Sequence, residues 1–206
     1  MPQVLKPEIR ARILSAGLEV FAEQGYLGAT MNAIAERAGL GAASLYRYFP
    51  SKTELFEAAI PPELAARFEQ LIEQRVSALA ELPAGAPFKP NHDYGAQMLD
   101  FWLEHRLAVV VLLDRAHGSA YESYGERFVG LLFEKTLEQI RGSGSNVRIT
   151  AAARLVLTRI FESTRSTLAS ILAHSDDPRA IRQGIEAFWS YQIPGLQGFA
   201  RWARKG

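Results

Sequence analysis

The stretch GLGAASLYRYFPSKTELF, residues 39–56, has a composition that suits neither a solvated helix nor a buried one. It opens with small residues, then places Tyr46, Tyr48 and Phe49 around Arg47, and turns polar at once. Small residues at the start of a helix let its backbone approach another surface closely. The aromatic and basic side chains after them are suited to contact with a surface lined by anionic groups.

Helical periodicity surrounds this stretch. Before it, Ile9, Ile13 and Phe21 fall on one helix face, and Gly25 fits a helix stop. A short helix then runs over 31–38, with Thr30 as its N-cap and Gly39 as its terminator.

A third short helix is predicted over 42–48, and the run Ser51-Lys52-Thr53-Glu54 has the form of a capping box that starts a fourth. Three short helices, with a tight glycine-containing turn between the second and the third, are the parts of a helix-turn-helix. Its second helix has to lie in the DNA major groove, which explains the small residues at its leading end.

The residues that we expect at the DNA follow partly from this placement and partly from a family resemblance given in the next paragraph. We expect Tyr46 and Lys52 to contact phosphates and Ser44 and Arg47 to hydrogen-bond to bases. For Tyr48, packing within the domain and contact with a phosphate are equally good interpretations. The full predicted set is Thr30, Gly41, Ala42, Ser44, Tyr46, Arg47, Tyr48 and Lys52.

The run from Gly25-Tyr26 through Thr30-Met31, Ala38-Gly39-Leu40, Leu45-Tyr46 and Tyr48-Phe49 to Ser51-Lys52 and Leu55 resembles the DNA-binding domain of the TetR (tetracycline-repressor) family. The resemblance covers about the first 55 residues in order and spacing. It implies that Thr30, Tyr46 and Lys52 touch the DNA backbone and that the third helix reads bases. The family often has serine or threonine where Gly41 stands, so we expect readout to rely on thymine methyl groups, Arg47 and DNA shape.

The rest of the chain is also helical by pattern, so the predicted fold is all-α with two domains, a helix-turn-helix domain at 1–54 and a larger ligand-binding and dimerisation domain at 55–206. Pro61-Pro62 interrupts a helix and is either a hinge or only a helix-start kink. We expect helices over about 93–116, 121–141 and onward to 174, with the apolar run 107–113 in a central position. A further helix restarts at Asp177-Pro178 and breaks at Pro194-Gly195. Loops are predicted at 83–92 and 142–145.

Two functional surfaces are predicted in the larger domain. A pocket for a small, largely apolar effector needs a few polar groups among apolar ones. Taken singly, most of the aromatic members fit plain core, and each polar member fits a satisfied core or surface group better than a ligand contact. By resemblance, the last two helices pair across a homodimer, and intrachain core is the competing interpretation. The pocket set is Met98, Phe101, Trp102, His105, His117, Tyr121, Tyr124, Phe128, Ser163, Thr164 and Thr167; the dimer set is Ile181, Ile185, Phe188, Trp189, Phe199 and Trp202.

Composition limits the function classes. The 206 residues have a net charge of +1, so any attraction to DNA must come from a local patch, such as the cations Lys6, Arg10 and Arg12. There is no cysteine, no zinc-ligand spacing, no P-loop and no dinucleotide fingerprint, and we expect no cofactor, metal or enzymatic activity. No signal peptide or membrane span is apparent, and a cytoplasmic location is expected.

The sequence therefore predicts a transcriptional regulator that binds a palindromic operator as a dimer. By resemblance it is a repressor, and its effector shifts the fourth helix and releases it from DNA. The alternative is a helical small-molecule sensor or carrier without specific DNA binding.

Overall fold

The computed structural model of the protein describes residues 6–80, 93–141 and 149–203, and within them the chain is helical with no strand. The predicted loops at 83–92 and 142–145 lie outside the described residues. The elements are α1 (Pro7–Gly28), α2 (Met31–Arg37), α3 (Ala42–Tyr48), α4 (Lys52–Ala59), α5 (Pro62–Ala80), α6 (Asp93–Glu104), α7 (Arg106–Val110), the π-helix η1 (Val111–Arg115), α8 (Tyr124–Arg141), α9 (Ala151–His174) and α10 (Pro178–Ala203).

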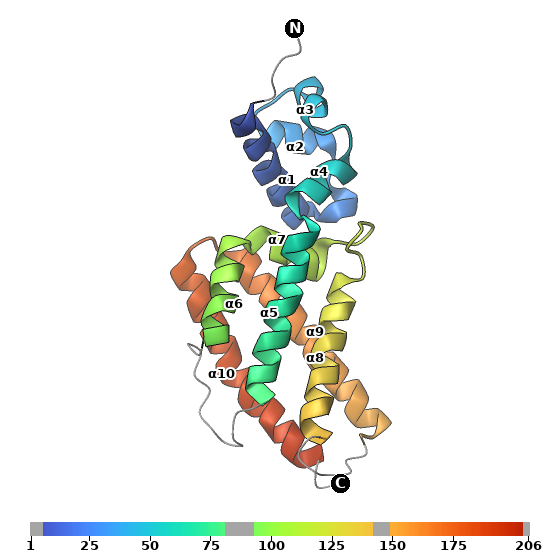
Figure 1. Ribbon diagram of the computed structural model, residues 1–206, viewed down its shortest axis with the longest axis vertical. Coiled ribbons are helices and arrows are strands. Elements are labelled where there is room, and N and C mark those ends of the chain that lie inside the picture. Colours follow the sequence, from blue (N-terminus) through green and yellow to red (C-terminus); the bar gives the residue numbers. More distant parts are fainter. Residues whose placement is uncertain (1–5, 81–92, 142–148, 204–206) are drawn as a thin grey trace.

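Helices α1 to α4 form a unit at one end of the molecule, and the longer helices form the rest (Figure 1). The predicted helix starts after Thr30 and Ser51 and the predicted stop at Gly39 are confirmed, whereas α1 runs three residues past the predicted stop at Gly25. The backbone leaves helical geometry at Gly25, with φ of 71°, and Gly39 ends α2 with φ of 65°. The hydroxyl groups of Thr30 and Ser51 each accept a hydrogen bond of 3.1 Å from the amide three residues later.

The unit has an aromatic core. The rings of Phe21 and Phe56 meet edge to face at 5.0 Å, and Tyr26 lies 4.8 Å from Phe56. Leu45 and Leu55 are fully buried. The predicted domain boundary after residue 54 thus falls within α4, whose Leu55 and Phe56 pack against α1.

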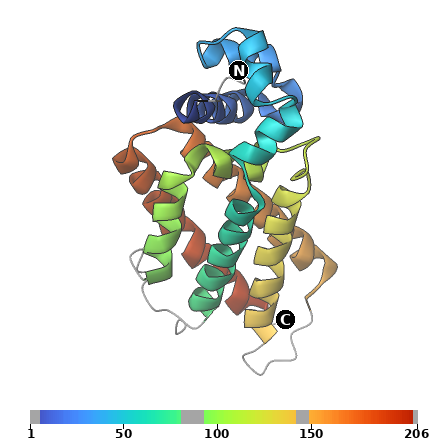
Figure 2. The same cartoon turned by 45° about the horizontal axis from the view of Figure 1, so that its top comes forward.

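In the larger part, α5 packs against α6 and α8, while α9 packs against α7, α8 and α10. Figure 2 shows α5, α6 and α8 side by side in front of α9 and α10. The π-helix η1 contacts α1 as well as α8 and α9, so it lies where the two parts of the molecule meet.

The predicted single helix over 93–116 is wrong, because the chain bends at His105, where φ is −112° and ψ is 30°. The segment before the bend is amphipathic and packs on α5. The segment after it is apolar all round and packs between α1 and α9, and Ala108 to Leu113 are all buried there. The predicted central position of 107–113 is confirmed. One straight helix could not pack its first part on α5 and also place its second part between α1 and α9.

The two proline sites behave differently. Helix α4 ends at Ala59 and α5 begins at Pro62, so the predicted interruption at Pro61-Pro62 is confirmed. The predicted break at Pro194 is wrong, since α10 continues through it. Ser190 and Pro194 are both exposed, so water can hydrate the Ser190 carbonyl that lacks a donor.

No described helix is long and apolar enough to cross a membrane. The same described ranges contain no group of three His, Asp or Glu side chains placed to hold a metal ion.

Candidate nucleic-acid interface

Helix α3 lies at the tip of the molecule (Figure 1), and small residues form its leading end. Gly41 is the exposed N-cap, and a Cβ there would meet no atom within 4 Å. The fold therefore does not require a glycine at this position. Ala42 and Ser44 are half-buried and add little height. This end of α3 can approach a groove closely.

The following turn of α3 separates packing residues from outward ones. Leu45 and Phe49 are buried in the core, whereas Tyr46 is 47% exposed and Arg47 is exposed. Thr30, also exposed, lies at the start of α2, where its hydroxyl caps the helix. Helix α3 is therefore anchored by Leu45 and presents Tyr46 and Arg47 on its outer surface.

Tyr48 connects α3 to the start of α1. Its half-buried hydroxyl accepts a hydrogen bond of 3.1 Å from the backbone amide of Lys6. The guanidinium of Arg10 lies 5.2 Å from the centre of the Phe49 ring. Two cations at the start of α1 are thereby held beside α3. The predicted set lacks Lys6 and Arg10, and their segregation at the N-terminus was the only signal for them in the sequence.

Lys52 is held against the end of α1. Its ammonium donates hydrogen bonds to the carbonyls of Tyr26 at 2.7 Å and Ala29 at 2.9 Å, with a longer one to Leu27 at 3.4 Å. It also lies 4.5 Å from the centre of the Tyr26 ring. Burial lowers the pKa of Lys52, but the carbonyl oxygens favour its charged form. In this arrangement Lys52 joins α4 to α1.

Arg37 contributes nothing to the charge around α3. It pairs with Glu19 at 3.1 Å and with Glu23 at 2.7 Å, which ties α2 to α1. The hydrogen bond from Arg37 lowers the pKa of Glu23, and the two carboxylates raise the pKa of Arg37. The basic groups left near α3 are those of its own Arg47 and of the start of α1.

The predicted pocket aromatics form a packed cluster. Met98, Phe101, Trp102, Tyr124 and Phe128 are buried. Phe68 of α5 fills the space between several of them, with its ring 5.5 Å from Phe101, 5.9 Å from Tyr124 and 6.3 Å from Phe128. Phe68 thus brings Phe101, Tyr124 and Phe128 together, and it is a member that the sequence pattern did not identify.

The polar members of the predicted pocket are dispersed. Thr164 is buried and accepts a hydrogen bond of 2.8 Å from Gln192, while the ring of His105 lies tilted against that of Phe101, with their centres 4.7 Å apart. The side chain of His117 is 78% exposed and pairs with Glu122. Tyr121 lies 6.2 Å from Phe56 at the junction with the N-terminal unit, Ser163 is exposed and Thr167 is half-buried. A pocket formed by all eleven residues stays a prediction.

Two buried polar atoms near this cluster have no hydrogen-bond partner in the described part of the chain, Nε1 of Trp102 and Oε1 of Gln74. They lie on α6 and α5, which pack together. One is a donor and the other an acceptor, and a buried polar group without a partner costs free energy.

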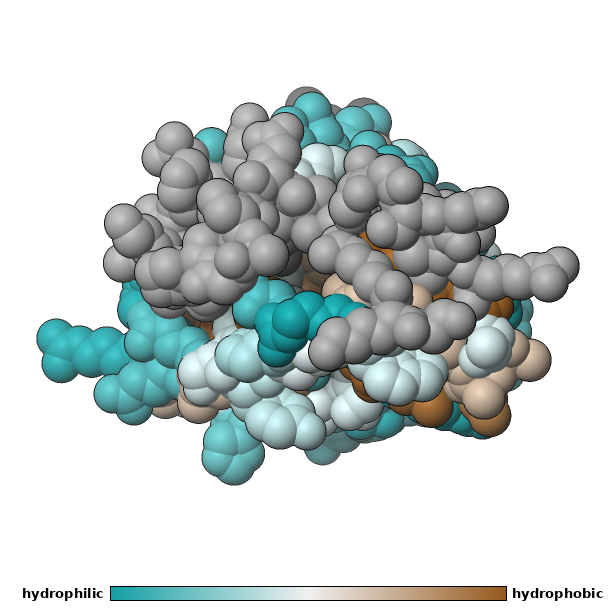
Figure 3. Space-filling view, turned by 90° about the horizontal axis from the view of Figure 1, so that it is seen from below, coloured by the Kyte–Doolittle hydropathy of each residue, from teal (hydrophilic) through white to brown (hydrophobic). Residues whose placement is uncertain are grey.

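The predicted dimer residues divide between core and surface. Ile181 and Ile185 are buried within the chain, Phe188, Trp189 and Phe199 are half-buried, and Trp202 is 59% exposed. The predicted dimer residues all lie on α10, and the prediction missed its Tyr191, which is 79% exposed. It also missed Leu155 and Val156, large exposed apolar residues on α9. The start of α9 and the end of α10 lie at the end of the molecule away from α3, and hydrophobic surface shows at the margin of that end in Figure 3.

Comparison with known proteins agrees with this geometry. Over 82 residues the chain is 39% identical to the HTH-type transcriptional repressor KstR of Mycolicibacterium smegmatis, a match that covers 40% of this chain and 37% of that protein. The chain thus spans little more than a third of the length of this relative. It is 26% identical over 188 residues to an uncharacterized HTH-type transcriptional regulator of Mycobacterium tuberculosis, covering 89% of this chain and 86% of that one.

The fold is shared with a solved structure. A TetR family transcriptional regulator from Chloroflexus aurantiacus superposes with a TM-score of 0.51 at 18% identity, covering 98% of this chain and 94% of the other. Residues 13–59, which include α2, α3 and α4, match the model of the bacterial regulatory proteins of the tetR family. By this match and the geometry of its helix-turn-helix, residues 13–59 are similar to the DNA-binding domain of the tetR family.

Proposed function

We propose that this protein is a DNA-binding transcriptional regulator that acts in the cytoplasm as a dimer and has no enzymatic activity. The observation that carries the proposal is the surface of α3. Its leading end is low and needs no glycine for packing, and Tyr46, Arg47 and the start of α1 surround it with aromatic and basic groups. Such a surface enters the major groove with α3 and meets phosphates on both sides.

The dimer is supported by the outer faces of α9 and α10. Leu155, Val156, Tyr191 and Trp202 are exposed there although each is large and apolar. Covering such side chains against a second copy removes them from water. A two-fold dimer then presents two α3 helices to the half-sites of a symmetric operator, about 34–36 Å apart.

The proposed regulation is release from DNA by a small, largely apolar effector, which makes the protein a repressor. Nε1 of Trp102 and Oε1 of Gln74 support an interior site between α5 and α6, since a ligand with one acceptor and one donor satisfies both atoms. The break between α4 and α5 at Pro61-Pro62 supports a hinge through which that site affects the N-terminal unit. The effector must bind the released state better than the DNA-bound state.

Fluorescence anisotropy tests the DNA-binding proposal. The purified protein is titrated against duplex fragments flanking its own coding region, at several salt concentrations. We expect tight binding to one fragment with steep salt dependence, and loss of that binding in Tyr46→Ala. Tyr191→Phe, which keeps a large ring at an exposed site far from α3, is the matched control. Absence of selective binding both here and in selection from random-sequence DNA would leave only a sensor without DNA function.

A further inference from the structure

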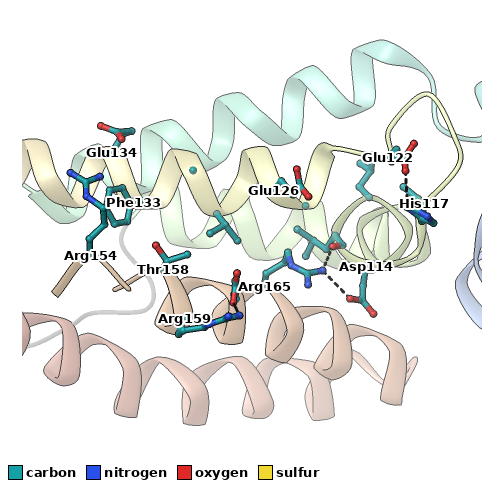
Figure 4. A pocket seen from close by; sticks show the side chains of 17 residues that line it. Asp114, His117, Glu122, Glu126, Phe133, Glu134, Arg154, Thr158, Arg159 and Arg165 are labelled. Carbon is teal, nitrogen blue, oxygen red and sulfur yellow. Dashed lines mark hydrogen bonds and ion pairs between the residues drawn. The ribbon is translucent and has the colours of Figure 1, made fainter. Parts of the chain in front are cut away.

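A groove separate from the aromatic cluster runs between α8 and α9 and ends on η1, with a volume of about 830 Å³ (Figure 4). Leu113, Val129 and Phe133 line it as buried apolar residues. Gly130 leaves room above them, because a Cβ at that position would meet no atom within 4 Å. The groove has the size that binds drug-sized ligands and an apolar floor on which one can lie.

Each of the three arginines that α9 contributes to the groove is already engaged. The guanidinium of Arg154 lies 5.0 Å from the centre of the Phe133 ring on the groove floor. Arg159 pairs with Glu162 at 2.6 Å, and Arg165 pairs with Asp114 of η1 at 2.9 Å. An anionic ligand has to displace one of these contacts before it can form its own.

The carboxylates on α8, unlike the arginines on α9, are not engaged. Glu126 and Glu134 line the groove on either side of Gly130, and neither forms a hydrogen bond or ion pair with any residue that the structure describes. They are eight residues apart on one helix, which corresponds to a rise of roughly 12 Å. The lining holds two more carboxylates than guanidinium groups. The net charge of the lining is therefore negative, and Glu126 and Glu134 are the two of its carboxylates that form no ion pair.

We propose that this groove binds an elongated organic cation, with a positive group near each of Glu126 and Glu134 and an apolar middle over Gly130 and Phe133. The spacing of the two carboxylates selects the length of the ligand, and the apolar floor favours a methylene chain or flat ring between the charges. Such a ligand differs from the small apolar effector proposed for the interior, so this is a second site with its own chemistry.

The groove is connected to the DNA-binding unit through η1. Arg165 donates hydrogen bonds to the Leu113 carbonyl and to Asp114, so α9 holds this wall of the groove directly. On its other side η1 contacts α1. A Cβ at Gly25 would lie 3.7 Å from the backbone oxygen of Arg115.

The turn that follows η1 makes a second contact with α1. The side chain of Leu27 closes over Gly118 so tightly that a Cβ there would lie 2.4 Å from Leu27 Cδ2. A ligand that moves η1 therefore moves the end of α1, and π-helical segments are frequent at functional sites. This part of the inference rests on the proposed DNA binding.

Isothermal titration calorimetry on the full chain tests the site without DNA. The probe is 1,8-bis(trimethylammonio)octane, and the dianion suberate and the monocation octyltrimethylammonium serve as charge controls. We expect the dication to bind once per chain and more tightly than either control. The double variant Glu126→Gln/Glu134→Gln should bind it roughly fivefold or more weakly. The matched variant Glu73→Gln/Asp100→Asn changes two exposed carboxylates outside the groove and should bind it normally. No binding, or equal binding by the first variant, overturns the site.

Anisotropy on duplex DNA tests the coupling. The dication should lower the DNA affinity of the wild-type protein by about fivefold or more. The Glu126→Gln/Glu134→Gln variant reports any direct effect of the dication on DNA. Leu27→Ala, which lies outside the groove and removes the side chain that closes over Gly118, should bind the dication normally but show a weaker effect on DNA affinity. An equal effect in all three proteins overturns the coupling. Absence of DNA binding before any dication is added refutes the proposed function instead, and leaves the calorimetric result intact.

Discussion

Replacement of Lys52 by methionine distinguishes two roles for this residue. The family resemblance predicts a phosphate contact, whereas the structure places the ammonium against the carbonyls of Tyr26 and Ala29. Methionine keeps an unbranched apolar side chain that can still cover Tyr26 but removes the charge and its donors. If the structural role dominates, the variant loses thermal stability, and the salt dependence of its DNA binding is unchanged.

The expected loss follows from the contacts. A hydrogen bond from a charged donor contributes about 1.5–3 kcal/mol, and we take about 1 kcal/mol for each of the two short ones because Lys52 is only half-buried. Its position 4.5 Å from the Tyr26 ring adds about 0.5 kcal/mol. The sum of about 2.5 kcal/mol lowers the Tm of a chain of this size by roughly 5–10 °C.

Two measurements check this expectation. Thermal unfolding by circular dichroism gives the Tm of Lys52→Met beside that of Lys135→Met, which removes a lysine paired with Glu138 on α8. Titration of non-specific duplex DNA at several salt concentrations gives the slope of log K against log salt, whose magnitude falls by about 0.9 for each phosphate that the protein no longer neutralises. We expect Lys52→Met to keep its slope and Arg10→Met to reduce it by about 0.9. An unchanged Tm together with a reduced slope in Lys52→Met would refute the structural role.

Three further changes test other parts of the molecule. Tyr191→Glu should convert the dimer to monomer in analytical ultracentrifugation with little loss of Tm, because the ring is 79% exposed; a persistent dimer would place the interface elsewhere. Burial raises the pKa of Tyr124 far above 10, so the unfolded chain ionises first and stability should fall above pH 10 by roughly 1 kcal/mol per pH unit. Urea unfolding at pH 9 and pH 11 should show a smaller fall in Tyr124→Phe, and an equal fall would assign the effect to another group. Gly125→Ala puts a Cβ 2.7 Å from the Leu113 carbonyl and should cost about 1–3 kcal/mol in the same assay at pH 7; no cost would mean that η1 adjusts freely.

The N-terminal unit could be predicted almost completely because its signals are local. Thr30, Gly39 and Ser51 each determine a helix end through their own backbone or side chain, as predicted, and Gly25 interrupts helical geometry within α1. The contacts of Lys6 and Arg10 with α3 could not be predicted in the same way. They join residues about forty positions apart, and no periodicity records such a pair.

In the larger domain, the sequence predicted most of the helices but not how they pack against one another. The chain bends at His105 because the segments before and after it pack against different helices. The periodicity within one helix does not record which helices it will pack against, so the bend could not be predicted. Pro194 is tolerated because its side of α10 is exposed, which the sequence around it does not specify. Phe68 fills the centre of the predicted pocket aromatics from α5, a helix that the pocket prediction did not include.

The end of α1 offers a second path between the two parts of the molecule, besides the chain connection at Pro61-Pro62. Gly25 and Leu27 contact η1 and the turn after it, and Lys52 ties the same end of α1 to the start of α4. A shift of η1 therefore acts on the N-terminal unit without any change in the bend between α4 and α5. Replacement of both prolines by alanine should then weaken the response to an effector bound between α5 and α6, and leave intact the response to a cation bound between α8 and α9.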